Sequence, residues 1–383
     1  MLFLCIFAVY MTHLYIHIPF CRRRCVYCDF YSTTSESKKG KYVDALCGEI
    51  KYRACELPSR RLDTIYIGGG TPSQLTPKEL EQIFDTVESS FSVSSDAEIT
   101  MEANPDDMDE EYVAALSSMP VNRISMGVQS FDDRQLGFLR RRHNSRGAVD
   151  AYKACRKYGF ENVSMDLMYG LPGQDMNDWE QDVRTMISLR PEHISAYHLI
   201  YEEGTPLYSL LLRGKVSEVD EELSLAMYRR LVDMLCDEGY EHYEISNFAR
   251  RGMESRHNSC YWDGEPYLGC GAAAHSYDGC RRRWNNASLE EYIDGAGHPP
   301  FGYEELDTDT KYNDYVMTRL RTNSGISTDE VARLFSPELA VYMMENAGRY
   351  IDNGMLERHN GRIRLSREGI FVSDGIMSDL MKV

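Results

Sequence analysis

Short apolar segments alternate with segments of helical periodicity between residues 14 and 200. The apolar segments have the length of buried strands, and the segments between them repeat their apolar residues every three or four positions. The predicted strands are residues 14–18, 62–67, 97–102, 122–128, 162–168 and 194–200, and the predicted helices are residues 38–57, a helix beginning at Thr76 and Pro77, 109–119, 145–158 and 176–189. Because strands joined through helices pair in parallel with right-handed crossovers, the sequence predicts an α/β fold. Six strands favour an open partial (β/α) barrel over a closed eight-stranded one.

Two helix boundaries carry explicit signals. Thr76, Pro77 and Glu79 form the pattern of a capping box with a proline in the first turn. Pro58 follows the first helical segment and is expected to end it, because proline cannot continue a helix. These signals fix where the first two helices stop and start.

Polar residues lie at the carboxyl ends of the predicted strands. Residues 68–71 come after the second strand, Glu102 ends the third and Gln129 ends the fourth. In barrels of parallel strands the chemistry lies at these carboxyl ends. A buried strand has little reason to end in a carboxylate unless a ligand requires one, so we expect a functional site there.

Three cysteines follow the first strand in a C-x3-C-x2-C pattern, namely Cys21, Cys25 and Cys28. A 4Fe-4S cluster usually takes four cysteine ligands, and Phe30 stands where a fourth sulfur could come. The pattern therefore suggests a cluster with one iron open to a non-protein ligand. A zinc site short of one ligand, or three buried small hydrophobic residues, are the alternatives.

A glycine-rich turn, GGGTPS at residues 68–73, follows the second strand, and glycines there let a ligand approach the backbone. This turn, the cysteine loop and Tyr27 before the last cysteine together resemble the radical S-adenosylmethionine family. The resemblance implies a 4Fe-4S cluster whose open iron binds the amino and carboxylate groups of S-adenosylmethionine. In that family an electron from the cluster cleaves S-adenosylmethionine to a 5′-deoxyadenosyl radical.

Four further motifs resemble the coproporphyrinogen-oxidase-like branch of that family: MEANP, GVQSF, LRRRH and MDLMYGLPGQ. By this resemblance the S-adenosylmethionine contacts are Tyr15, Tyr27, Gly69, Gly70, Thr71, Glu102, Gln129, Arg141 and Asp166. A structural ion pair or helix cap is the alternative for each. The family often has G-R-I-H where this chain has Arg140, Arg141, Arg142 and His143, so the arginine that reaches the ligand stays open.

A long helix is predicted over residues 220–238 and a strand over 241–248, followed by the hexapeptide HNSCYW at 257–262. The H-N-x-x-Y-W pattern resembles a marker of the HemW branch of haem chaperones. His257 is the candidate haem contact, because histidine is a usual haem ligand, and His13, His17, Cys260 and His275 compete for that role. The alternative is a structural turn with a satisfied histidine and a core tryptophan.

The remainder of the chain has helical patterns at 311–321, 328–334 and 337–353, then a hairpin over 356–365 that turns at Asn360 and Gly361. Three helices and a hairpin predict a winged-helix-like C-terminal domain. We therefore expect a core domain over residues 12–240, a barrel extension over 241–305 and the C-terminal domain over 306–383.

The resemblance implies a haem chaperone that carries a 4Fe-4S cluster and S-adenosylmethionine, with haem, haem-acceptor proteins and an electron donor as partners. The alternative is an oxygen-independent coproporphyrinogen III oxidase, which converts two propionates to vinyl groups. Phe30 favours the chaperone, because the oxidases carry another cysteine there. A third alternative is a methyltransferase or another radical enzyme with the same barrel fold, but that function does not explain the HNSCYW motif. The sequence leaves open whether the chain is an enzyme.

The net charge and the cysteine content indicate which partners and which cellular compartment to expect. A net charge of −18 argues against nucleic acid, because phosphate binding relies on clustered cations. Eleven cysteines without a convincing secretory signal favour a reducing cytoplasm.

The apolar start, residues 1–11, lacks a basic region and is too short to span a bilayer. Met11 is expected to be the true start, and a lipid-surface anchor is the alternative.

Overall fold

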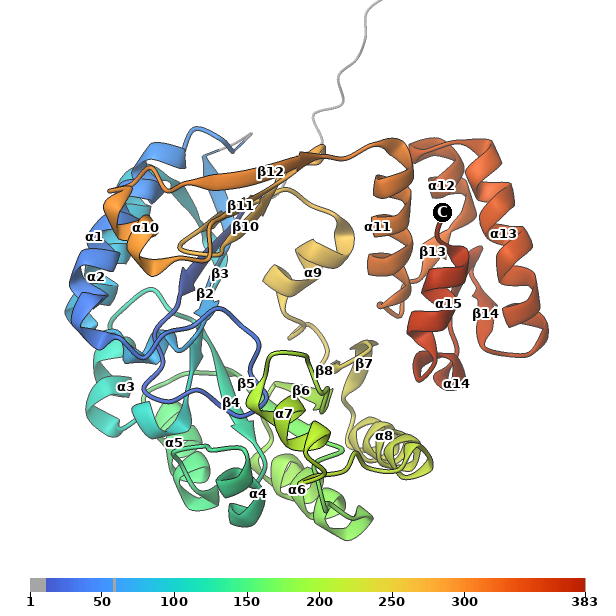
Figure 1. Ribbon diagram of the computed structural model, residues 1–383, viewed down its shortest axis with the longest axis horizontal. Coiled ribbons are helices and arrows are strands. Elements are labelled where there is room, and N and C mark those ends of the chain that lie inside the picture. The colour runs from blue at the N-terminus through green and yellow to red at the C-terminus, as the bar shows by residue number, and fades with distance from the viewer. Residues whose placement is uncertain (1–11, 58–59, 383) are drawn as a thin grey trace, which may run out of the picture.

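The computed structural model describes residues 12–57 and 60–382. The expected start at Met11, the apolar run before it and Pro58 lie outside the described residues. The helix expected over residues 38–57 ends earlier, at Arg53, so its predicted end is wrong. Figure 1 shows a curved sheet with helices along its convex side, and a separate group of helices that contains the C-terminus.

The centre of the sheet is a set of six parallel strands in chain order, as predicted. They are β1 (His13–Ile18), β2 (Arg61–Gly69), β3 (Ser92–Ala103), β4 (Arg123–Gln129), β5 (Asn162–Tyr169) and β6 (His193–His198). The helices between them are α1 (Lys39–Arg53), α2 (Pro77–Ser90), α3 (Glu110–Leu116), α4 (Asp133–Phe138), α5 (Ser145–Lys157) and α6 (Met176–Leu189). Apolar residues of both layers form one core cluster. The parallel α/β arrangement of the radical S-adenosylmethionine type is confirmed, and α4 is a short helix that the sequence analysis did not predict.

Local sequence signals explain where the helices begin. The Thr76 hydroxyl accepts from Glu79 N, and the Glu79 carboxylate accepts from Thr76 N over 2.8 Å, so the predicted capping box at the start of α2 is confirmed. Asp175 and Asp178 form the same reciprocal pair at the start of α6. Each pair satisfies backbone donors that a first helical turn leaves free.

The strand predicted over residues 241–248 is wrong as a single element. It is a hairpin of β7 (Glu241–Glu244) and β8 (Asn247–Ala249), which follows α7 (Pro206–Leu212) and α8 (Glu221–Asp237). Glu244 Oε1 accepts from Ser246 N and from the Asn247 side chain, and these two bonds hold the turn of the hairpin. β8 pairs antiparallel with β6, so this hairpin closes one end of the sheet.

The other end of the sheet is extended by β9 (Tyr267–Cys270), which pairs in parallel with β1. Antiparallel strands β10 (His275–Tyr277), β11 (Arg281–Asn285) and β12 (Phe301–Glu305) complete a twelve-stranded sheet, and α10 (Leu289–Asp294) lies between the last two.

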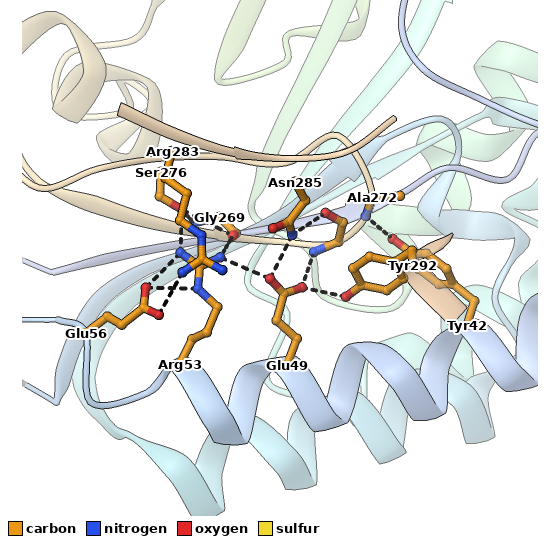
Figure 2. Close-up of polar contacts among 11 residues, drawn as sticks. Tyr42, Glu49, Arg53, Glu56, Gly269, Ala272, Ser276, Arg283, Asn285 and Tyr292 are labelled. Atoms are coloured by element: carbon orange, nitrogen blue, oxygen red, sulfur yellow. Dashed lines mark hydrogen bonds and ion pairs between the residues drawn. The ribbon is translucent and has the colours of Figure 1, made fainter. Parts of the chain in front are cut away.

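A buried polar network joins this extension to α1 (Figure 2). Arg53 is 1% exposed and donates to Glu49 Oε1 over 3.0 Å and to Gly269 O over 2.7 Å. Glu49 is fully buried and also accepts from Gly271 N, Asn285 and Tyr292. Because both charges are paired and hydrogen-bonded, they are tolerated in the interior and fix β9 beside β1.

The chain after residue 306 has its own core cluster. Its elements are α11 (Thr308–Leu320), β13 (Ile326–Ser327), α12 (Thr328–Leu334), α13 (Pro337–Asp352), β14 (Leu356–His359), β15 (Arg362–Leu365), α14 (Arg367–Ile370) and α15 (Ser373–Leu380). Asn360 and Gly361 have φ values of 49° and 78°, as a two-residue hairpin turn requires. The predicted three helices and hairpin are therefore present. No helix of the described residues is long and apolar enough to cross a membrane.

Candidate functional site

The cysteine loop leaves β1 at its carboxyl end and is bonded to the elements around it. Backbone bonds from Cys21 N to Thr33 O and from Thr33 N to Pro19 O close the loop onto itself. The Thr71 hydroxyl donates to the Cys21 sulfur over 3.4 Å, and Arg141 Nη1 donates to the Cys25 sulfur over 3.3 Å. Two of the three predicted ligands thus contact residues of the predicted S-adenosylmethionine site.

The donor set fits an iron–sulfur cluster. All three cysteines are free; Cys21 is buried, and Cys25 and Cys28 are half-buried. Burial raises the pKa of the Cys21 thiol and raises that of Cys28 to about 11, so a bound cation is needed to hold them as thiolates at neutral pH. Phe30 is 64% exposed, so the position of a fourth sulfur is taken by a side chain that faces solvent.

The glycines at the carboxyl end of β2, Gly68 to Gly70, have no space for side chains. Gly69 has a φ of 109°, and a Cβ there would lie 2.5 Å from the His17 ring. A Cβ on Gly70 would lie 2.8 Å from the Pro19 carbonyl carbon, and a Cβ on Gly68 would lie 3.0 Å from the Glu102 carboxylate. Glycine therefore allows this turn to pack against the cysteine loop and leaves the carboxylate uncovered.

Glu102 is the penultimate residue of β3 and lies beside that turn. Its carboxylate accepts from the Tyr66 hydroxyl over 2.8 Å and from Gly69 N over 3.1 Å. Burial raises the pKa of Glu102 to about 7, and the nearby Asp166 adds to the rise. The group is thus close to its midpoint at neutral pH, and an ammonium or a pair of hydroxyls would stabilise its ionised form.

Arg141 and Asp166 present polar atoms that have no partner. Arg141 Nη2 donates to Asn104 Oδ1 over 2.6 Å and to Gly127 O over 2.5 Å, while its Nε has no partner. Burial raises the pKa of Asp166 to about 6, and its Oδ1 also has no partner. Because buried polar atoms are normally hydrogen-bonded, these two fit a polar ligand at this position.

Of the three consecutive arginines, Arg141 is the one that the structure places at the site. Arg140 is exposed with a φ of 60°, and Arg142 pairs with Asp106 and Asp107. Gln129 has a φ of 74° at an irregularity in β4, and it is buried beside Gly127 and Arg141. The bulge turns its side chain towards the other site residues, as bulges beside functional sites do.

The two tyrosines lie on different sides of the site. The Tyr15 hydroxyl lies 2.9 Å from His17 Nδ1, and its ring stacks on Tyr66 at 6.2 Å. Tyr27 packs against the small apolar cluster around Val26 that supports the cysteine loop. Tyr27 is therefore part of the cysteine loop itself, whereas Tyr15 lies on the inner face of the sheet.

Sequence reasoning missed two residues that complete the site. Asn104 accepts from Arg141 and donates to Thr71 Oγ1 over 3.3 Å, and it lies within the MEANP motif. Tyr66 donates to Glu102 and lies two residues before the glycine turn, so its side chain faces the same side of β2 as Gly68. Asn104 could have been identified because it lies within the MEANP motif, and Tyr66 because it shares a strand face with Gly68.

His257 lies far from the cysteine loop, in a helix rather than a turn. The hexapeptide forms α9 (Arg256–Asp263), which Ser255 caps. His257 is fully buried; its Nδ1 lies 2.6 Å from Thr64 Oγ1, and its Nε2 lies 2.8 Å from the Tyr261 hydroxyl. Thr64 precedes Gly69 on β2 by five residues, or about 16 Å of strand.

Both ring nitrogens of His257 are therefore occupied, and burial holds its pKa well below the usual value. A neutral, satisfied ring matches the structural alternative for this motif better than an iron ligand. Trp262 is half-buried beneath the Arg321 guanidinium at 5.0 Å, so it is not a core residue.

The competing haem candidates are also placed by the structure. His13 Nε2 lies 2.7 Å from Glu265, and His17 Nε2 lies 3.1 Å from Tyr31 O. The ligand atoms of His13, His257 and Cys260 lie within 4.8 Å of one another. His275 stacks on Trp284 on the extension of the sheet. The two histidines of the β1 face are thus hydrogen-bonded, and neither faces solvent.

Two family models match the chain: the radical SAM superfamily over residues 15–186 and the HemN C-terminal domain over residues 306–372. The heme chaperone HemW of Bacillus subtilis (strain 168) is 35% identical over 364 residues, which cover 94% of this chain and 96% of the relative. The heme chaperone HemW of Mycobacterium tuberculosis (strain ATCC 25618 / H37Rv) is 34% identical and covers 96% of this chain and 94% of the relative.

A solved structure of coproporphyrinogen III oxidase (HemN) from Escherichia coli, described as a radical SAM enzyme, matches with a TM-score of 0.83. The match covers 97% of this chain and 90% of that chain at 21% identity. At this identity the likeness shows the fold alone.

Proposed function

This chain belongs to the HemW family of heme chaperones, with a radical S-adenosylmethionine core, and from this premise we propose that it binds haem and transfers it to acceptor proteins. The observation that carries the proposal is the identity of 34–35% with HemW proteins over nearly the whole of both chains. A match of that extent includes the cysteine loop, the extension with the HNSCYW helix and the C-terminal domain.

Cys21, Cys25 and Cys28 would hold the 4Fe-4S cluster, because they offer the soft thiolate donors that iron–sulfur clusters take. When bound, the cluster and S-adenosylmethionine supply the chemistry of the radical S-adenosylmethionine family, and reduction of the cluster requires an external electron donor. The chain itself supplies orientation and exclusion of water.

For S-adenosylmethionine, the proposed contacts have complementary chemistry. The Arg141 guanidinium suits the carboxylate of the ligand, and its unpartnered Nε is a free donor. Glu102 and Asp166 suit the amino group and the ribose hydroxyls, and the ionised form of each is favoured once such donors are present. Gly69 and Gly70 leave the backbone uncovered beside them.

The alternative is an oxygen-independent coproporphyrinogen III oxidase. The likeness to the oxidase structure supports the shared fold, but at 21% identity it does not carry the activity. Phe30 favours the chaperone, because the residue that stands in place of a further cysteine is an exposed phenylalanine.

Two parallel measurements on the anaerobically reconstituted protein test the proposal. In the first, haem is added and binding is followed through the Soret band, with the triple Cys21, Cys25 and Cys28→Ala variant as a control for the role of the cluster. In the second, coproporphyrinogen III is supplied with S-adenosylmethionine and a reductant. We expect saturable haem binding and no vinyl product. Robust decarboxylation would contradict the proposal and assign the oxidase activity.

A further inference from the structure

Helix α9, which contains the HNSCYW motif, lies on the concave side of the sheet, opposite the layer of α1 and α2 (Figure 1). Its first turn is fixed on β3, where the buried Glu98 carboxylate accepts from Arg256 N over 3.1 Å and from His257 N over 3.0 Å. A carboxylate at a helix N-terminus is favourable, because the free backbone donors there carry partial positive charge. The helix is therefore attached to β3 through its backbone.

Side chains of α9 reach the two neighbouring strands. His257 Nδ1 lies 2.6 Å from Thr64 Oγ1 on β2, and the same hydroxyl lies 2.8 Å from His13 Nδ1 on β1. Thus α9 is hydrogen-bonded directly to β2 and β3, and the Thr64 hydroxyl links it to β1. These three strands carry the cysteine loop, the glycine turn and Glu102 at their carboxyl ends.

One layer of side chains separates His257 from the candidate site. Alternate residues of a strand share a face, so Thr64 and Tyr66 point to the same side of β2. The Tyr66 ring stacks on the His257 ring, with centroids 5.1 Å apart and planes at 26°. On its other side the Tyr66 hydroxyl donates to Glu102 Oε1 over 2.8 Å. Tyr15 packs against the same two rings, at 6.2 Å from Tyr66 and 6.5 Å from His257.

We propose that His257 is a positioning residue for S-adenosylmethionine: its ring holds Tyr66 in the conformation in which the Tyr66 hydroxyl donates to Glu102. The proposal deepens the function given above and rests on it, since Glu102 is taken as a ligand contact. It gives the HNSCYW motif a role that does not require His257 to bind iron. The full burial of His257 and the bonds to both of its nitrogens are what such a role requires, because they fix the plane of the ring.

The test measures S-adenosylmethionine affinity by equilibrium dialysis on reconstituted protein, with cluster content and the absorption of bound haem recorded in parallel. Tyr66→Phe removes one hydrogen bond to a charged acceptor at constant volume, so we expect affinity to fall about tenfold. His257→Ala is expected to give a similar loss, whereas His257→Phe retains a flat ring and should lose less. The double variant Tyr66→Phe/His257→Ala should bind S-adenosylmethionine with an affinity within about twofold of that of Tyr66→Phe alone. The two changes are not additive, because both act through the Tyr66 hydroxyl.

His242→Ala is the matched control. His242 is a partly buried histidine that stacks on Phe248 at 4.3 Å and donates to Ile245 O, in the hairpin β7–β8. It contacts no residue of the candidate site, so we expect unchanged affinity. Thermal unfolding of each variant shows whether a loss of affinity comes from an unfolded protein or from a displaced Tyr66 side chain. If the His257 variants do not fold, Tyr66→Phe still tests the proposal.

Two results would overturn the proposal. One is a folded His257→Ala protein that binds S-adenosylmethionine as the wild type does. The other is a shift of the Soret band in His257→Ala with the affinity unchanged, which would make the residue a haem ligand. Because dialysis is read without haem, a wild-type protein that binds S-adenosylmethionine but not haem would refute the chaperone function and leave this inference standing.

Discussion

The Arg141 guanidinium donates to the sulfur of Cys25 over 3.3 Å, which joins the cysteine loop to a residue 116 positions later in the chain. The same side chain is held in place by Asn104 and by the carbonyl of Gly127. Hydrogen bonds to cluster sulfurs and nearby positive charge stabilise the reduced, more negative form of a cluster. Arg141 therefore contacts both the proposed cluster and the proposed S-adenosylmethionine site.

Replacement of Arg141 by methionine is expected to lower the reduction potential of the cluster and to weaken S-adenosylmethionine binding about tenfold, because a charged hydrogen bond is lost from each. Redox titration followed by electron paramagnetic resonance measures the potential. Arg142→Met is the matched control, since Arg142 pairs with Asp106 and Asp107 instead. Equal potentials in the two variants would remove Arg141 from this role.

The three cysteines are expected to hold all of the cluster iron. Iron and sulfide are measured after anaerobic reconstitution of the wild type and of the triple Cys21, Cys25 and Cys28→Ala variant. A cluster that assembles equally in both would end the assignment. Cys155→Ala serves as a control, because Cys155 is a fully buried cysteine of α5 whose thiol burial keeps protonated.

S-adenosylmethionine binding should weaken as pH falls from 8 to 6. Burial raises the pKa of Glu102 to about 7, and the free protein must lose that proton before the carboxylate can accept from the ligand. The ionised fraction falls about tenfold over this range, so we expect a similar loss of affinity. Glu102→Ala and Asp166→Ala should bind weakly at every pH while they retain the cluster. A pH-independent affinity in the wild type would contradict the role of Glu102.

Glu102→Gln should make the ligand-free protein more stable at pH 8. Burial raises the pKa of Glu102 from its usual value of about 4.5 to about 7, so the folded state binds the extra proton and stability falls as pH rises from 4.5 through 7. Glutamine removes this dependence, and we expect a gain of roughly 1–3 kcal/mol in the free energy of unfolding at pH 8 that vanishes near pH 5. Urea unfolding at the two pH values measures the difference, and an equal effect at both would contradict it.

Glu49→Ala should destabilise the protein strongly, because it removes one of the two carboxylates that pair with the buried Arg53 and the acceptor of the buried Gly271 N and Tyr292 hydroxyl (Figure 2). A loss of about 3–5 kcal/mol is typical of such a change. Glu290→Ala is the control: its side chain is 65% exposed and pairs with Lys38 at the surface, so we expect a much smaller loss of stability. Comparable losses in the two variants would show that the network contributes little.

The sequence by itself determined the alternation of strands and helices, the capping box of α2, the hairpin turn at Asn360 and Gly361 and the spacing of the three cysteines. Each of these depends on residues within a few positions of one another, so local periodicity and turn chemistry record it. The motifs also carried the resemblance to the family, and with it most of the candidate site residues.

Only the tertiary structure decided which of three consecutive arginines faces the site, that residues 241–248 fold back on themselves, and that α9 lies beneath Tyr66. His257 meets Thr64 across 193 residues of sequence, and Arg53 meets Ser276 across 223. Helical or strand periodicity says that a side chain faces the interior, but it does not say what it meets there. That partner is set by how the sheet curves and by which buried polar groups must satisfy one another.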